Sequence, residues 1–178
     1  MSIQSQATKT KTWTLFSGHI CTGFFGGTAE KTVYFNLDVL GDVEIVSADL
    51  QIYARPTVGC AEQHVDIRFG EEQAGSISWS WFDTGARRTG IDISRYIRSG
   101  ENSFKILYSA AMPLLQTPCV ELEIKLTIVY RGTGTVTIPI AGPRIITYLY
   151  YILLILLLIG GGAFATWAVL RLWRKEKG

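Results

Sequence analysis

The side chains best suited to chemistry in this chain of 178 residues are three cysteines and two histidines. His19 lies two positions before Cys21, and Cys60 lies four positions before His64. Two cysteines and two histidines can form a tetrahedral zinc site or a copper centre. Their spacings differ from the paired knuckles of zinc ribbons, so a metal or redox site is the least favoured function, and no cofactor is predicted.

The same cysteines can instead form a disulfide. If the domain lies outside the cytoplasm, where disulfides persist, we expect a bridge between Cys60 and Cys119, because both flank predicted loops. That bridge would close a loop of about 60 residues and stabilise the fold by roughly 4 kcal/mol on the chain-entropy model. Cys21 would then be a buried apolar thiol or an intermolecular link.

A second group of residues suggests carbohydrate binding. The candidate site comprises Trp79, Trp81, Asp83, Arg87 and Arg88. Trp79 and Trp81 are two positions apart, so in a strand both would point to one face. Exposed indoles could stack on a pyranose ring while the charged groups bind its hydroxyls. The alternative is that both indoles fill the core of the domain.

No catalytic motif accompanies these residues. The sequence has no Gly-x-Ser-x-Gly elbow, no His-Glu-x-x-His and no phosphate-binding Gly-rich loop before a helix. Residues 1–144 carry 13 Lys and Arg against 14 Asp and Glu, which leaves no basic surface for nucleic acid. We therefore predict that the chain is not an enzyme and does not bind nucleic acid.

The C-terminal part of the sequence predicts a transmembrane helix. Residues 145–170 form a run of 26 residues without a formal charge. At about 1.5 Å per residue this run reaches about 39 Å, more than the roughly 30 Å hydrocarbon core of a bilayer. The tail at 171–178 holds four basic residues, so the positive-inside rule places it in the cytoplasm and the N-terminal domain outside.

The N-terminus shows no recognisable signal peptide. Three explanations stay open: a reverse signal anchor, processing of a longer chain, or a domain that remains inside as part of a tail-anchored protein. Within the apolar run, Gly161 and Ala165 form a small-x-x-x-small pattern. This pattern predicts close packing against a copy of the same helix or a partner subunit, and the alternative is a kinked span.

Residues 12–141 show the alternation of β-strands. The clearest run, from Val120 to Tyr130, places apolar residues at every second position over eleven residues. Shorter runs of the same kind are separated by turn residues, and a change of phase near Ser47 predicts a bulge. The sequence therefore predicts an all-β, antiparallel, jelly-roll-like sandwich between a flexible N-terminus at 1–11 and a linker at 142–144.

One short segment predicts a specific corner between strands: Gly90-Ile-Asp-Ile-Ser-Arg-Tyr-Ile-Arg-Ser-Gly-Glu-Asn102. Asp92 or Ser94 can cap a single helical turn over residues 94–98. Gly100 can supply a positive φ that closes the turn, and the final asparagine can bond to the exposed backbone.

This corner resembles the D-I-S-x-Y-I-x-x-G-x-N motif of galactose-binding-domain-like jelly rolls, a fold of carbohydrate-binding modules and of accessory domains in glycosidases. The resemblance covers about residues 45–130. It implies a β-sandwich but no single function, because that fold hosts sugar binding, protein binding and scaffolding. The ligand residues of such domains usually lie in variable loops, so the resemblance transfers none of them.

These features predict a non-enzymatic, single-pass membrane protein whose β-sandwich is a structural or assembly subunit of a larger envelope, virion or membrane complex. Its expected partners are the lipid bilayer and either copies of itself or other membrane subunits. The alternative is a surface-displayed carbohydrate-binding module with glycan partners, and the lesser alternative is a metal or redox-binding domain. Assembly predicts that Trp79 and Trp81 are buried, whereas carbohydrate binding predicts that they are exposed.

Overall fold

The computed structural model describes residues 7–59, 62–111 and 116–139, all within the unit Met1–Pro139. The expected transmembrane helix with Gly161 and Ala165, and also Cys60, lie outside the described residues. Within the described part of the chain, no helix is long and apolar enough to cross a membrane.

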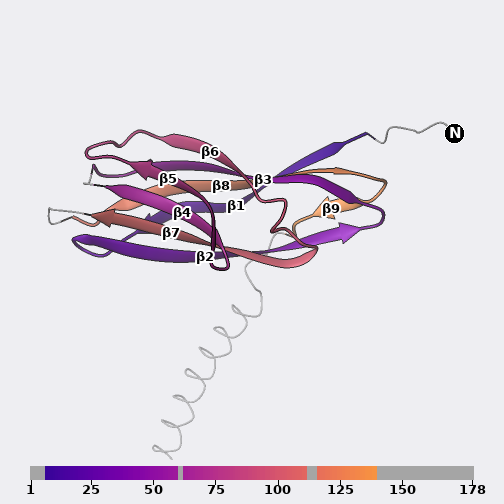
Figure 1. Ribbon diagram of the computed structural model, residues 1–178, viewed down its shortest axis with the longest axis horizontal. Helices are drawn as coiled ribbons and strands as arrows, with labels where there is room; N and C mark the ends of the chain where they lie inside the picture. The colour runs from indigo at the N-terminus through magenta and orange to yellow at the C-terminus, as the bar shows by residue number, and fades with distance from the viewer. Residues whose placement is uncertain (1–6, 60–61, 112–115, 140–178) are drawn as a thin grey trace, which may run out of the picture. The chain divides into compact units, whose positions relative to one another are not determined.

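The described residues form nine strands in two antiparallel sheets (Figure 1). The strands are β1 (Lys9–Cys21), β2 (Gly26–Leu40), β3 (Glu44–Pro56), β4 (Gln63–Phe69), β5 (Glu72–Trp79), β6 (Arg87–Asp92), β7 (Gly100–Ala111), β8 (Cys119–Arg131) and β9 (Thr135–Thr137). The first sheet has the order β1-β8-β3-β6, and the second has the order β5-β4-β7-β2-β9. The predicted antiparallel β-sandwich is confirmed.

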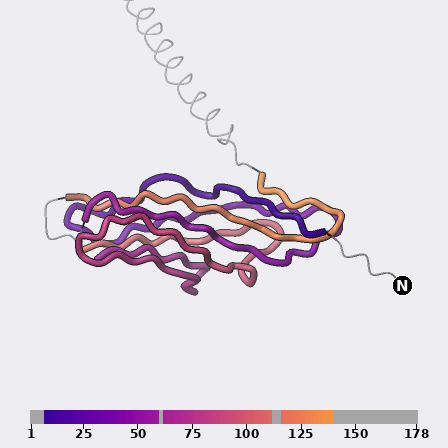
Figure 2. The backbone as a smooth tube through the Cα atoms, turned by 90° about the horizontal axis from the view of Figure 1, so that it is seen from above, coloured from indigo at the N-terminus to yellow at the C-terminus, as the bar shows by residue number. Residues whose placement is uncertain are grey.

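The core lies between the two sheets, which form two layers of strands (Figure 2). In β8 the even-numbered positions from Val120 to Tyr130 are all buried, whereas no odd-numbered residue of that strand is. In β7 the inward positions include Phe104, Ile106 and Tyr108, each at most 1% exposed. The alternation in the sequence therefore reports which face of each sheet is buried.

Two boundaries differ from the prediction. β1 begins at Lys9 and pairs with β8, so part of the segment expected to be flexible belongs to the sheet. Lys11 secures this region, because its Nζ donates a hydrogen bond to the carbonyl oxygen of Val136 at 2.8 Å. β5 ends at Trp79, so Trp81 lies beyond the strand in which it was expected. The bulge predicted near Ser47 is confirmed by a shift in the register of β3 with β8.

The predicted corner between β6 and β7 is also present, although its turn covers only residues 94–96. The Oδ1 atom of Asp92 accepts hydrogen bonds from the backbone N–H of Ser94 at 2.9 Å and from its hydroxyl at 2.6 Å. Gly100 has a φ of 95°. The side-chain amide of Asn102 braces the corner. Its oxygen accepts a hydrogen bond from the backbone N–H of Arg98, and its nitrogen donates to the carbonyl oxygens of Arg98 and Gly100.

Replacing Asn102 by Ala is expected to lower the free energy of unfolding by about 1–2 kcal/mol, because each net hydrogen bond contributes about 0.5–1.5 kcal/mol and some of these are exposed. Asn36→Ala is the matched control, since the Asn36 amide makes one side-chain bond, to Asp38 at 2.5 Å. Urea unfolding of both variants measures the difference. Equal losses for the two variants would contradict the bracing role of Asn102.

Candidate functional site

Several loops meet at one end of the sandwich, at the left in Figure 1. The end of β1 pairs with the start of β8 at Cys21 and Cys119, and the start of β2 pairs with the end of β7 at Gly26 and Ala111. The end of β5 pairs with the start of β4, which also lies beside the end of β7. The loops from β1 to β2 and from β5 to β6 therefore share this end.

These two loops carry four of the five exposed aromatic side chains among the described residues. Phe24 and Phe25 are 58% and 60% exposed, and Trp81 and Phe82 are 55% and 78% exposed. The rings lie in two pairs, with centroids 5.0 Å apart in the first and 5.8 Å apart in the second. β4 and β7 separate β2 from β5, so the bases of the two loops are roughly 14 Å apart. We call these four residues the aromatic end.

The backbone of the aromatic end is strained at two positions. Phe25 has a φ of 79° and Phe82 a φ of 63°, and they are the two non-glycine residues with positive φ in the described part of the chain. For an L-residue this conformation costs about 1–2 kcal/mol. Because both rings are exposed, burial in the core does not offset that cost.

The β5–β6 loop is held by hydrogen bonds that form around Trp79. This indole is 2% exposed, and its Nε1 donates to the carbonyl oxygen of Gly85 at 2.7 Å. The backbone N–H of Gly85 donates to Asp83 at 2.8 Å, and Arg87 forms an ion pair with the same carboxylate at 2.6 Å. The Gly85 bond, followed by the Arg87 bond, lowers the pKa of Asp83 below its ordinary value, so its carboxylate is ionised at neutral pH.

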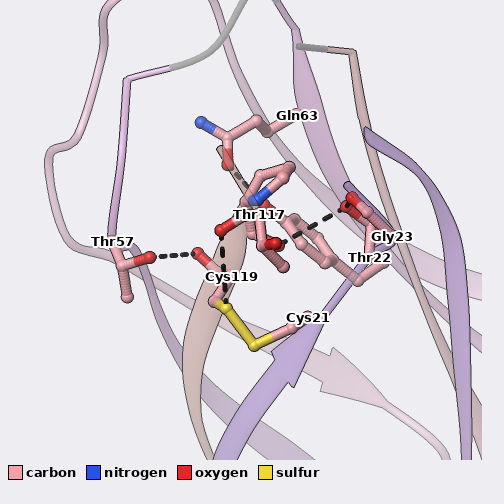
Figure 3. Close-up of a disulfide and its surroundings, with 9 residues drawn as sticks. Cys21, Thr22, Gly23, Thr57, Gln63, Thr117 and Cys119 are labelled. Carbon is pink, nitrogen blue, oxygen red and sulfur yellow. Dashed lines mark hydrogen bonds between the residues drawn. A yellow bond between two sulfur atoms is a disulfide. The ribbon is translucent and has the colours of Figure 1, made fainter. Parts of the chain in front are cut away.

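The β1–β2 loop is held by a disulfide between Cys21 and Cys119 (Figure 3). The backbone N–H of Thr22 donates to the carbonyl oxygen of Pro118 at 3.0 Å, and Thr57 donates to that of Cys119 from both its N–H and its hydroxyl. The predicted bridge between Cys60 and Cys119 is therefore wrong. Cys21 and Cys119 are direct cross-strand partners, so the pairing of β1 with β8 brings their sulfur atoms together.

The disulfide also removes a ligand from the predicted metal site of His19, Cys21, Cys60 and His64. A disulfide sulfur is no longer the thiolate that binds zinc. His19 lies on β1 and His64 on β4, which belong to different sheets. Among the described residues, no group of three or more His, Cys, Asp and Glu side chains could hold a metal ion.

The five residues of the predicted carbohydrate site do not form one surface in the structure. Trp79 is not the exposed platform that the carbohydrate interpretation needs, because its indole lies in the core, as the assembly interpretation predicted. Trp81 is exposed just after the strand, as the carbohydrate interpretation predicted, so neither interpretation holds for both indoles. Asp83 lies in the β5–β6 loop with Trp81, and Arg87 is the first residue of β6, but these two charged side chains form an ion pair with each other. Arg88 is elsewhere, on β6 in the first sheet, opposite Tyr53 of β3.

A groove on the outer face of the first sheet was missed by the sequence analysis. Its volume is about 610 Å³. It is lined by Gln51, Ile52, Tyr53, Arg88, Thr89, Gly90, Glu123 and Lys125. These residues come from β3, β6 and β8, so the groove exists only once the three strands have paired. The glycine within β6 was the one local signal, because glycine inside a strand often marks a site where another molecule approaches.

Comparisons with known proteins do not identify a family. No family model matches the chain, and no curated protein matches it. One similar solved structure is that of the infectious bursal disease virus Gx strain, at 9% identity and a TM-score of 0.40, with 86% of this chain and 49% of that chain covered. This chain thus spans about half the length of the viral chain.

Two other similar structures are carbohydrate-binding modules. The CBM36-1 domain of a multidomain xylanase from the hindgut metagenome of Trinervitermes trinervoides shares 12% identity at a TM-score of 0.33, with 71% of this chain and all of that chain covered. A CBM36 module in complex with calcium and xylotriose shares 8% identity at a TM-score of 0.31, with 65% of this chain and 97% of that chain covered. At TM-scores below 0.5, no family, ligand or assembly is transferred to this chain.

Proposed function

We propose that this chain is a non-enzymatic, single-pass membrane protein whose β-sandwich serves as an assembly subunit, binding another protein through the aromatic end. The apolar run at 145–170 and the basic tail at 171–178 support the membrane anchor. The Cys21–Cys119 disulfide supports a sandwich outside the cytoplasm, because disulfides persist in oxidising compartments.

The observation that carries the proposal is the strained backbone under exposed rings at Phe25 and Phe82. Strained residues persist where the surrounding structure holds them, and they concentrate at functional sites. Here the disulfide holds one loop and the Trp79–Gly85 hydrogen bond holds the other. Aromatic side chains are enriched at protein interfaces, and loops that are already ordered lose less entropy on binding.

The charges around the aromatic end favour a protein partner over an anionic bilayer. Among the described residues, those with a formal charge in the loops at this end, or within two residues of the strand ends there, are Glu62, Asp83 and Glu121 with Arg55, Arg87 and Arg88. Both signs are present without a basic excess, and anionic lipid surfaces attract basic clusters. A two-fold contact pairs the same surface of two copies, and the exposed rings of the two loops would then meet other exposed rings rather than a pocket that encloses them. The partner is therefore a different subunit with an apolar pocket.

The test compares full-length protein with the double variant Phe25→Gly/Phe82→Gly, extracted in mild detergent. Glycine adopts positive φ readily, so the variant is expected to be as stable as the parent or more stable by up to about 1 kcal/mol per site. Loss of two interface anchors should weaken partner binding at least tenfold, since anchor residues typically contribute about 2 kcal/mol or more each. Tyr34→Ser is the control, because Tyr34 is 79% exposed on β2, away from the aromatic end.

Light scattering and mass spectrometry of the co-purified proteins give the readout. A stoichiometric partner that is retained by Tyr34→Ser and lost from the double variant would support the proposal. A partner held equally by all three proteins would contradict it. Binding to lipid vesicles that depends on Phe25 and Phe82, in the absence of a protein partner, would also overturn it.

A further inference from the structure

The groove on the first sheet is built from two rows of outward side chains. Arg88, Tyr53 and Glu123 face one another across β6, β3 and β8 in the first row. In the next row, Gly90 and Lys125 flank Gln51 in the same way. Residues two apart along a strand are about 7 Å apart, and the three strands span about 10 Å, so the floor suits a ligand of one or two sugar rings.

Gly90 leaves the space open. A Cβ atom added at this position would meet no other atom within 4 Å, and the backbone there has no positive φ that would demand glycine. Glycine weakens a strand interior, and neither backbone conformation nor packing requires it here. A side chain at this position would project into the groove between Arg88 and Gln51, so the glycine keeps the groove accessible.

The groove carries one cation that no protein carboxylate neutralises. Lys125 forms an ion pair with Glu123 at 3.0 Å. The guanidinium of Arg88 lies 5.6 Å from the centroid of the Tyr53 ring. Among the residues that the structure describes, the side chain of Arg88 has no ion-pair or hydrogen-bond partner, so the Tyr53 contact positions its guanidinium while the guanidinium N–H donors stay available for a ligand.

We infer that this groove binds a saccharide that carries a carboxylate. Arg88 supplies the paired N–H donors that match a carboxylate. Gln51 offers both a donor and acceptors for sugar hydroxyls, and the Glu123–Lys125 pair offers more of each. The wall formed by Tyr53 contacts the apolar C–H face of the sugar. The groove thus combines a few convergent polar groups with an aromatic surface, within the size range of ligand sites.

This inference is independent of the proposed protein contact, because the groove and the aromatic end share no residue. The test applies full-length protein in mild detergent to an array of oligosaccharides that contain uronic or sialic acids. The array also carries their methyl esters, which remove the charge and keep the sugar skeleton, and neutral chains. We expect retention on the carboxylate-bearing chains and at least tenfold weaker binding to the esters.

Two variants and a control locate the site. Arg88→Ala removes the cation, and Gly90→Val fills the groove with a residue that strands favour, so each should weaken saccharide binding at least tenfold. Gly90→Val should unfold at no lower urea concentration than the parent. Ser103→Val places the same side chain on an exposed strand position of the other sheet and should bind as the parent does.

Three outcomes would overturn the inference. The first is that no carboxylate-bearing saccharide is retained, and the second is that the esters or neutral chains bind as well as the acids. The third is that Arg88→Ala and Gly90→Val both bind like the parent. Partner binding through Phe25 and Phe82 is read separately by co-purification, so failure of one proposal is distinguishable from failure of the other.

Discussion

Replacing Trp79 by Ala is expected to lower the free energy of unfolding by about 3–5 kcal/mol, the usual range for removing a large buried aromatic side chain. The indole is 2% exposed, so its loss leaves a cavity in the core. The carbonyl of Gly85 also loses the donor that holds the β5–β6 loop. Because domains are stable by only about 5–15 kcal/mol, Trp79→Ala would remove a large part of the total stability. Urea unfolding measures this loss.

The matched control lies two residues away. Trp81→Ala removes the same side chain from a position that is 55% exposed, so its stability should change by no more than about 0.5 kcal/mol. Trp79→Phe keeps most of the side-chain volume but loses the hydrogen bond to Gly85, so we expect it to lower the free energy of unfolding by about 1–2 kcal/mol. If Trp81→Ala destabilised the protein as much as Trp79→Ala, the assignment of the Trp81 indole to the surface would be wrong.

Trp79 and Trp81 show why a local sequence pattern was not sufficient. Two residues that are two positions apart point to the same face only if the strand includes both, and β5 ends at Trp79. By contrast, the alternation from Val120 to Tyr130 correctly indicated the buried face of β8, because that face is decided by every second residue. The corner at Asp92 and Asn102 was equally predictable, since its hydrogen bonds join residues at most four positions apart.

Features that depend on the pairing of strands far apart in the chain could not be predicted from local sequence patterns. The disulfide joins residues 98 positions apart, and its partners follow from the register of β1 with β8, which no local period encodes. The groove likewise needs Gly90 beside Gln51 and Gln51 beside Lys125, on three strands from different parts of the chain. The aromatic end could be anticipated only as exposed rings in predicted turns, because its strained φ values appear only in three dimensions.

Removing the disulfide with Cys21→Ser/Cys119→Ser is expected to lower the free energy of unfolding by about 2–4 kcal/mol. β1 is one of the two edge strands of its sheet, and the bridge fastens its last residue to β8. The β1–β2 loop begins at this point, so the double variant should also hold Phe24 and Phe25 less firmly. We therefore expect weaker partner binding as well as lower stability.

Peptide mapping of the unreduced protein tests the same bridge directly. A peptide that links Cys21 to Cys119 is expected, and Cys60→Ser should change neither that link nor the urea midpoint. Leu37→Ala separates loss of stability from loss of partner binding, because Leu37 is fully buried and pairs with Gly100 at the opposite end of β2, so its removal leaves the bridge and both loops of the aromatic end in place. If Cys119 were instead linked to Cys60, or if the double serine variant were as stable as the parent, the disulfide would not be what holds this end of the sandwich.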